Sequence, residues 1–334
     1  MDIRKIENII EKDFSGIVSI NKNGKNIFCK SYGYSDIPNK IDNEIDTKFA
    51  IASGGKIFVA VAILKLIEDE KLSFNTTIGS ILDFDLQEID SKITIRQLLN
   101  HTSGIPDYFD EDIMEEYEEL WVDYPNYKIR NSSDIIPLFI NKPMMYPSGE
   151  EFKYNNTGYV VLGLIIEILT GVKFDEYIQK NIFEPCGMIN TGYYELDRLP
   201  EKCANSYIYD KDKNDYKTNI YSVDVKGTGA GGTFITVSDL EKFWLALLSY
   251  KLISKESVDE MLYPQANNEN ETYGYGIWIK KGSDELYKYN IEGLDPGISF
   301  YSSLDREIGL IITLISNTQR NVWKQYREII EVIS

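Results

Sequence analysis

Ser53 and Lys56 are a pair of residues whose types and spacing could do chemistry. They stand three positions apart in IASGGKIFVA, residues 51–60, where an apolar helical pattern begins. Side chains three apart on a helix share a face, and a desolvated lysine can lose its proton and then accept one from serine. A serine here could also be a plain helix cap, although a cation in the first turn opposes the helix dipole. The spacing alone leaves both interpretations open.

His101 is the only histidine, which restricts the chemistry available to the chain. A Ser-His-Asp triad, a two-histidine zinc site or a histidine switch would each have to use it or not exist. The sequence also lacks a G-x-x-x-x-G-K-[ST] phosphate loop and a G-x-G-x-x-G after a strand. Acid and base chemistry is therefore expected from Lys, Tyr, Asp or Glu, and no metal or organic cofactor is implied.

The composition predicts a folded, acidic protein. With 334 residues, 43% of them hydrophobic, the chain is long enough for one large domain or two closely packed ones. Its net charge of -18 would repel nucleic acid and anionic membrane surfaces, so neither is expected as a partner. No apolar run is long enough for a transmembrane segment, and the start lacks the apolar core of a signal peptide. A cytoplasmic location is expected, although a chain trimmed of its signal would look the same.

The elements that must position the pair follow a pattern of strands at both ends of the chain and helices between them. Residues 1 to about 13 predict an amphipathic helix, and two alternating strands follow around the turn Asn23-Gly24. Apolar helical runs dominate from residue 57 to about 225. The C-terminal part predicts a helix, four strands and a last helix, at residues 237–248, 273–281, 285–292, 298–305, 307–317 and 320–333. The economical arrangement is one antiparallel sheet covered by terminal helices and interrupted by a helical insertion.

Four separated stretches decide between the interpretations of Ser53. FAIASGGKIFVAVAIL, ITIRQLLNHTSGIPDY, PSGEEFKYNNTGYVVLG and GTGAGGTFITVSDLEKF occur in the order and spacing of the penicillin-binding, class C β-lactamase-like serine hydrolases. The chain resembles this family from about Phe14 to Asn317. The resemblance implies an α/β (α+β) fold with a five-stranded antiparallel sheet and an all-helical insertion domain, and an active site in the groove between them. The predicted domains are residues 1–60 with 225–334 (sheet) and 61–224 (mainly helical).

The resemblance also assigns roles to residues. The family's nucleophile corresponds to Ser53, its general base to Lys56, and its Y-x-N motif to Tyr154 and Asn156. Physically, a phenol near the lysine can pass a proton to the leaving group, and an amide can hold the acyl-side amide of a substrate. His101 is expected to be structural, bonded to backbone in the turn that supports the groove.

The third motif of the family, a lysine or histidine two residues before a glycine, is altered. The alignment places Ile291 at the basic position, Glu292 next and then Gly293. Lys288 could replace the cation only through a bulge, because strand side chains alternate. The glycine would still let a substrate approach, and the N–H of Leu294 could complete an oxyanion hole with that of Ser53. The acylation groups are thus expected to survive without the anion-binding cation.

These residues predict a serine hydrolase that acts through an acyl-enzyme on a neutral or amine-bearing ester or amide. The expected partner is a small-molecule or peptide substrate, bound by Asn156 and residues 291–294. Two alternatives stay open, a β-lactamase or D,D-peptidase and a catalytically weak sensor or binding homologue. The oligomeric state is not indicated by the sequence.

Overall fold

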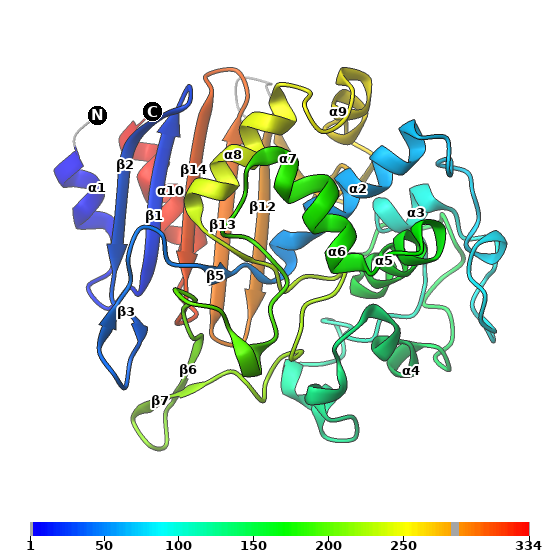
Figure 1. Cartoon of the computed structure of the whole chain (residues 1–334), viewed down its shortest axis with the longest axis horizontal. Helices are drawn as coiled ribbons and strands as arrows, with labels where there is room; N and C mark the ends of the chain where they lie inside the picture. The colour runs from blue at the N-terminus through cyan, green and yellow to red at the C-terminus, as the bar shows by residue number, and fades with distance from the viewer. Residues whose placement is uncertain (1–2, 282–286, 334) are drawn as a thin grey trace.

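The computed structural model describes residues 3–281 and 287–333. Its centre is one antiparallel sheet in the order β2-β1-β14-β13-β12-β11-β10-β9 (Figure 1). In chain order the strands are β1 Gly16–Lys22, β2 Lys25–Tyr32, β9 Ala266–Asn267, β10 Thr272–Tyr273, β11 Trp278–Lys281, β12 Tyr287–Asp295, β13 Ile298–Asp305 and β14 Leu310–Ser316. The first strand of the chain therefore pairs with the last, which closes the fold on itself.

The sheet is apolar on both faces because helices cover both. On one face, α1 (Ile3–Ile9) and α10 (Val322–Ile333) pack on side chains such as Val18 and Ile312. On the other, α8 (Val237–Leu248) and α2 (Lys56–Glu68) pack on alternate residues such as Ile17 and Ile315. Figure 1 shows α8 crossing in front of the strands and α10 behind them. The predicted turn is confirmed, since Asn23 and Gly24 have φ of 53° and 74° between β1 and β2.

The remaining elements lie mostly in the middle of the chain. The other helices are α3 Ile95–Leu99, α4 Ile136–Phe139, α5 Asn156–Thr170, α6 Phe174–Ile178, α7 Glu184–Cys186 and α9 Lys255–Met261. Short 3-10 turns are η1 Ala52–Gly55, η2 Ile78–Ser80, η3 Tyr117–Trp121, η4 Asn126–Lys128, η5 Ser132–Ile135 and η7 Leu196–Arg198, and η6 Gln179–Phe183 is a π turn. Three two-stranded pairs are β3 Tyr34–Asp36 with β4 Ile41–Asp42, β5 Phe49–Ala50 with β8 Phe234–Ile235, and β6 Tyr207–Asp210 with β7 Asp215–Thr218.

The helices α2 and α5 form the interior of the molecule. Ten of the eleven residues of the first from Lys56 to Leu66 are buried, and Lys65 is half-buried. The first eleven residues of α5 are likewise buried. Helices that are apolar around their whole circumference belong in a core. Residues at their N-termini are therefore held in dense packing, which is where the candidate site lies.

The predicted fold class is confirmed, with a difference in the number of strands. The sheet has eight strands where five were expected. The predicted strands correspond to β1, β2 and β11 to β14, whereas β9 and β10 have two residues each, too short to give an alternating pattern. The N-terminal helix ends at Ile9 and not near residue 13. Residues 1–2 of that helix and 285–286 of the strand expected at 285–292 lie outside the described residues.

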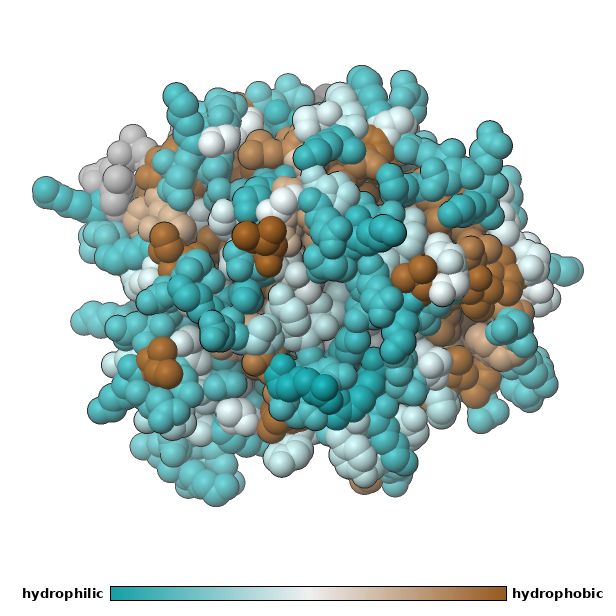
Figure 2. Space-filling model, in the orientation of Figure 1, coloured by the Kyte–Doolittle hydropathy of each residue, from teal (hydrophilic) through white to brown (hydrophobic). Residues whose placement is uncertain are grey.

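Nothing in the structure tests the domain boundaries, and the one at residue 60 falls inside α2. Over the described ranges no single helix is long and apolar enough to cross a membrane, and α5 with Phe174–Cys186 passes that test only as a pair bent by 79°. The face seen in Figure 2 is mostly hydrophilic, with apolar residues in small groups. This surface agrees with the large net charge of the chain.

Candidate active site

The turn η1 presents Ser53 immediately before α2. Neither the turn nor the helix is capped by a side chain, so the helix-cap interpretation of this serine is wrong. Ala52 precedes it with a φ of 47°, a left-handed conformation that side chains seldom adopt. The conformation is held by Gly232, whose N–H donates to the carbonyl of Ala52 at 3.1 Å. A strained, over-determined turn of this kind is typical of a functional position.

Packing explains the two glycines that follow the serine. A Cβ at Gly54 would lie 2.4 Å from the ring of Phe300, and one at Gly55 would lie 2.6 Å from Oγ1 of Thr233. Neither distance is compatible with a real side chain. The glycines therefore let the turn sit directly between the sheet and the loop 227–233.

Lys56 makes three hydrogen bonds in the core. Its Nζ lies 2.8 Å from Ser53 Oγ, 2.9 Å from Asn156 Oδ1 and 2.5 Å from the carbonyl oxygen of Ala230. The residue is 1% exposed. Burial lowers the pKa of its ammonium to about 8, while the charges of Asp107, Glu111 and Asp295 act in the opposite direction. A neutral amine is thus accessible near physiological pH.

The geometry determines where the lone pair of that amine points. Neutral lysine has two N–H groups and one lone pair. The two oxygens of Asn156 and Ala230 accept but cannot donate in this arrangement, so they take the two N–H groups. The lone pair is then left for the hydroxyl proton of Ser53. This is the arrangement that a lysine general base requires.

Asn156 is the first residue of α5, and a buried carboxylate holds it in place. Asp107 accepts hydrogen bonds from the backbone N–H groups of Asn156 at 2.8 Å and Thr157 at 3.1 Å. Burial raises the pKa of this carboxyl to about 6, although those hydrogen bonds and the nearby Lys56 lower it. Asp107 thus fixes the start of the helix. Asn155 caps the same helix by accepting from Gly158 N at 2.8 Å.

Tyr154 completes the cluster and is stacked between aromatic rings. Lys56 Nζ lies 4.9 Å from the centroid of its ring, and burial raises the pKa of its hydroxyl well above the ordinary value, although the Ser53 side chain lowers it. Its ring stacks on Trp278 at 5.5 Å between centroids and lies 4.5 Å from the ring of His101. The histidine Nδ1 accepts from the backbone N–H of Asn155 at 3.1 Å, and burial lowers its pKa well below the usual value. His101 is the structural histidine that the sequence predicts.

Strand β12 runs against the turn η1. A Cβ at Gly293 would lie 2.2 Å from the carbonyl oxygen of Ile51 and 3.0 Å from the backbone nitrogen of Ser53. The glycine is therefore required by contact between the strand and the turn, whereas the sequence suggested room for a substrate. Asp295 and Ile298 flank the two-residue hairpin turn, so the alternation of antiparallel pairing directs the N–H of Leu294 away from β13. That donor and the one of Ser53 are both available for an oxyanion.

The prediction that Ile291 contacts substrate is wrong. Its side chain is 2% exposed, belongs to the main core and lines neither pocket at Ser53. It shares a strand face with Gly293, which packs on the turn, and side chains two apart point the same way. Lys288 does not replace the missing cation, since its Nζ lies 3.6 Å from Asp305. Glu292 does face the groove, and Trp323 Nε1 donates to it at 2.8 Å.

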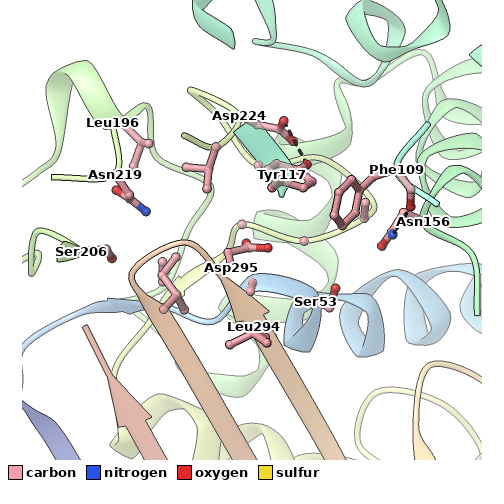
Figure 3. Close-up of a pocket in the computed structure, with 18 of the residues that line it drawn as sticks. Ser53, Phe109, Tyr117, Asn156, Leu196, Ser206, Asn219, Asp224, Leu294 and Asp295 are labelled. Atoms are coloured by element: carbon pink, nitrogen blue, oxygen red, sulfur yellow. Dashed lines mark hydrogen bonds between the residues drawn. The ribbon is translucent and has the colours of Figure 1, made fainter. Parts of the chain in front are cut away.

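Two connected hollows meet at Ser53. The inner pocket has about 720 Å³ of space, partly open to solvent, and is lined by Asn156, Asp224, Leu294 and Asp295 among others (Figure 3). The outer groove is lined by Tyr154, Trp278, Glu292, Gly293 and Leu294 among others. The acidic segment 108–127 contributes Phe109, Glu111 and Tyr117 to both. This segment forms a wall of the site.

The lining of both hollows is strongly acidic. The carboxyl-bearing residues are Glu111, Asp112, Glu115, Glu116, Glu118, Asp224, Glu271, Glu292 and Asp295. Among the described residues that line them, none is Lys, Arg or His. In the same part of the chain, no group of three His, Cys, Asp or Glu residues is arranged to hold a metal ion. The electrostatic field of the site thus favours a cation over an anion.

The structure brings Ser53, Lys56 and Asn156 into one hydrogen-bonded cluster, with the ring of Tyr154 against Lys56. It places Glu292, Gly293 and Leu294 beside this cluster. Their roles in catalysis and binding stay predictions. Residues that the sequence reasoning missed are Asp107, Glu111, Asp224, Trp278, Ala230 and Asp295. Two stretches gave a signal: the glycines at 229, 231 and 232 indicate close backbone approach around Ala230, and the acidic, aromatic segment 108–127, which contains Glu111, could form a lid over a pocket.

Comparison with known proteins agrees with this geometry. The family model described as Beta-lactamase matches residues 4–330. Penicillin-binding protein 4* of Bacillus subtilis (strain 168) is 32% identical over 287 residues, which cover 81% of this chain but 61% of that protein. A putative penicillin-binding protein, PbpX, from the same organism is 29% identical and covers 95% of this chain and 74% of its own length.

A solved structure shows the same fold. The crystal structure of a penicillin-binding protein from Bacillus halodurans superposes with a TM-score of 0.93 and 39% identity, covering 98% of this chain and 99% of that one. The family match spans nearly the whole chain and includes every segment that builds the cluster around Ser53. The chain therefore belongs to the Beta-lactamase family of serine hydrolases.

Proposed function

We propose that this protein hydrolyses a neutral or amine-bearing ester or amide through an acyl-enzyme on Ser53. The observation that carries the proposal is the contact of Lys56 Nζ with Ser53 Oγ at 2.8 Å, made by a buried lysine whose pKa falls to about 8. Its other two hydrogen bonds go to acceptors. Lys56 is therefore positioned to accept the hydroxyl proton of Ser53.

The reaction follows from the positions of these groups. Ser53 Oγ attacks the substrate carbonyl and gives its proton to neutral Lys56, while the N–H groups of Ser53 and Leu294 stabilise the oxyanion. The bond from the carbonyl carbon to the leaving group breaks, and the proton passes from Lys56 through Tyr154 to the departing alcohol or amine. Water then attacks the acyl-enzyme, releases the acid and restores the serine.

Two features support the substrate class. The position that is basic in the family motif holds the core residue Ile291, and the lining of the groove is acidic where the structure describes it. A substrate carboxylate would be repelled by Glu292 and Asp295, whereas an ammonium or a neutral group would not. An ester or amide without a carboxylate beside the scissile bond therefore fits better.

The test is labelling and turnover with wild type and Ser53→Ala. A fluorophosphonate is expected to label wild type at Ser53, and a neutral p-nitrophenyl ester is expected to be hydrolysed. Ser53→Ala should lose both, with Ser80→Ala on the surface as the matched control. Equal turnover in wild type and Ser53→Ala would refute the proposal.

A second candidate is a β-lactamase or D,D-peptidase, which the names of the penicillin-binding relatives favour. Fluorescent penicillin and nitrocefin distinguish it. Hydrolysis of nitrocefin at a rate above that of the neutral ester would favour the second candidate. A stable penicillin adduct without any turnover of esters or amides would instead indicate a binding or sensor protein.

A further inference from the structure

The inner pocket contains two polar side chains whose oxygens have no hydrogen-bond partner among the described residues. Ser206 is 7% exposed and Asn219 is 4% exposed, and both line the pocket. Asn219 Nδ2 donates to the carbonyl of Pro296 at 2.9 Å. Over the described ranges, Asn219 Oδ1 and the hydroxyl of Ser206 have no hydrogen-bond partner. Both residues line the pocket, where these two oxygens are available to a polar group of a ligand.

Two carboxyl groups enter the same pocket from different segments. Figure 3 shows Asp224, from the segment before β8, and Asp295, at the end of β12, beside the pocket that Ser53 lines. The hydroxyl of Tyr117 donates to Asp224 at 3.3 Å. Within the described part of the chain, Asp295 has no hydrogen bond or ion pair to its carboxyl group. Two carboxylates without a cation in a confined space repel each other.

The titration of the pair agrees with this picture. Burial raises the pKa of Asp224 to about 7, and burial together with the charge of Asp224 raises the pKa of Asp295 to about 7. The charges of Lys56 and Glu111 also act on Asp295, in opposite directions. A cation between the two carboxyl groups would remove both the repulsion and the unpaired charge.

The inner pocket belongs to the acyl side of the substrate. Ser53 lines both hollows, Asn156 lines only the inner pocket, and Tyr154 lines only the outer groove. On the proposed mechanism the tyrosine serves the leaving group and the asparagine faces the acyl side. The leaving group then departs into the outer groove, and the acyl group lies in the inner pocket.

We propose that the inner pocket binds a primary ammonium group on the acyl portion of the substrate, between Asp224 and Asp295. An ammonium has three N–H donors and no acceptor. Asp224, Asp295 and one of the two free oxygens, Ser206 Oγ or Asn219 Oδ1, supply three acceptors. The substrate class is thus an aminoacyl ester or amide. This inference rests on the proposed function and names the acyl group that the function leaves open.

The first experiment uses wild-type protein and pairs of ethyl esters of one shape. D-alanine and L-alanine ethyl esters are compared with ethyl isobutyrate, in which a methyl group replaces the ammonium, at about pH 7, where most of the amine is protonated. Acid release is followed by chromatography. We expect kcat/KM to be about tenfold or more higher for at least one alanine ester. Equal or higher kcat/KM for the isobutyrate overturns the inference.

The second experiment assigns the preference to the carboxyl pair. Asp295→Asn and Asp224→Asn should each lower the ratio of alanine ester to isobutyrate by about tenfold. Asp83→Asn removes the same charge from an exposed position outside both hollows and should keep the wild-type ratio. Wild-type ratios in both pocket variants would overturn the assignment. Thermal melting and the rate of fluorophosphonate labelling show whether each variant retains its fold and its nucleophile.

The two proposals fail in different ways. If Ser53 is not labelled and none of the three esters is hydrolysed, the proposed function itself is refuted. If Ser53 is labelled and kcat/KM for the isobutyrate equals or exceeds that for both alanine esters, only the ammonium pocket is refuted. The wild-type comparison stands without any variant, so a misfolded Asp295→Asn protein would not leave the inference undecided.

Discussion

The catalytic cluster and the inner pocket beside it differ in how their polar groups are satisfied. Around Lys56 every hydrogen-bonding position of the amine has a partner from the chain itself. In the inner pocket, Ser206, Asn219 and Asp295 keep oxygens without a partner among the described residues. Groups that perform the same step in every turnover are pre-organised by the protein, whereas groups that recognise a ligand stay unsatisfied until it binds.

The difference teaches which features of the site are general and which are particular to this chain. The cluster uses the residue types that the resemblance to the family predicts, and its geometry depends on backbone contacts such as that of Gly232 with Ala52. The pocket uses side chains from loops at 206, 219 and 224 and from the end of β12 at 295, where ordinary chain variation can change them. Packing thus restricts the groups that perform the attack, whereas the groups that line the pocket are open to substitution.

Replacement of the base should give the largest effect on the cluster. Lys56→Arg keeps the charge but cannot give a neutral base, since arginine stays protonated. We expect kcat/KM for a neutral ester to fall by about 10² to 10⁴. Lys65→Arg, one of the less buried positions on the same helix, is the control. Ester turnover within about twofold of wild type in Lys56→Arg would show that lysine is not the base.

The next prediction concerns the contact between β12 and the turn η1, which carries Ser53. Gly293→Val would place a Cβ about where the Ile51 carbonyl oxygen lies, because the ideal position is 2.2 Å away. We expect a loss of about 1 to 3 kcal/mol in the free energy of unfolding and about a 100-fold loss of ester turnover, as the oxyanion donors separate. Gly158→Ala, which meets only ordinary contacts, is the control. An active, fully stable Gly293→Val protein would contradict this account.

The pH profile connects the two regions. Lys56 acts as base only when neutral, so kcat/KM for a neutral ester should rise with pH, about tenfold per unit, and level off above an apparent pKa of about 8. The negative charge of Asp295 raises the pKa of the lysine. Asp295→Asn should therefore move the acid limb to lower pH, and Asp83→Asn should leave it in place. If the acid limb of the profile moves to higher pH in Asp295→Asn, the charge of Asp295 does not raise the pKa of Lys56 and this explanation is contradicted.

The smallest effect is expected at His101. Because it is the only histidine, its imidazole signals in a proton NMR spectrum need no assignment. Burial among rings lowers its pKa well below the usual value. We therefore expect no titration step between about pH 6 and about pH 8. A step in that range that coincides with the acid limb of activity would give the histidine a part in catalysis.

The sequence was a good guide to the fold and to the cluster. Alternating strands at both ends and apolar helices between them predicted the architecture, and the spacing of Ser53 and Lys56 predicted their contact. It was a poorer guide to β9 and β10, which consist of two residues each. It also misplaced Ile291, because an alignment gives the position along a strand but not the neighbour on which that side chain packs.

Local residue patterns in the sequence were sufficient to predict the type of chemistry. A serine and a lysine one helical turn apart, a single histidine and the missing cation at 291 together predicted the type of attack and the loss of an anion site. These are properties of residues close in sequence or of a residue's absence, and they need no coordinates.

Only the tertiary structure decided which groups surround the attacking serine. Asp224 and Asp295 are separated by seventy-one positions, and neither belongs to a motif that the sequence reveals. Their meeting in one pocket depends on long-range packing of a loop against the end of β12 (Figure 3). The pKa values of Lys56 and of the carboxyl pair likewise come from burial and neighbouring charge, which exist only in the folded chain. Recognition is therefore a property of the fold, while the chemistry of the nucleophile is already present in the sequence.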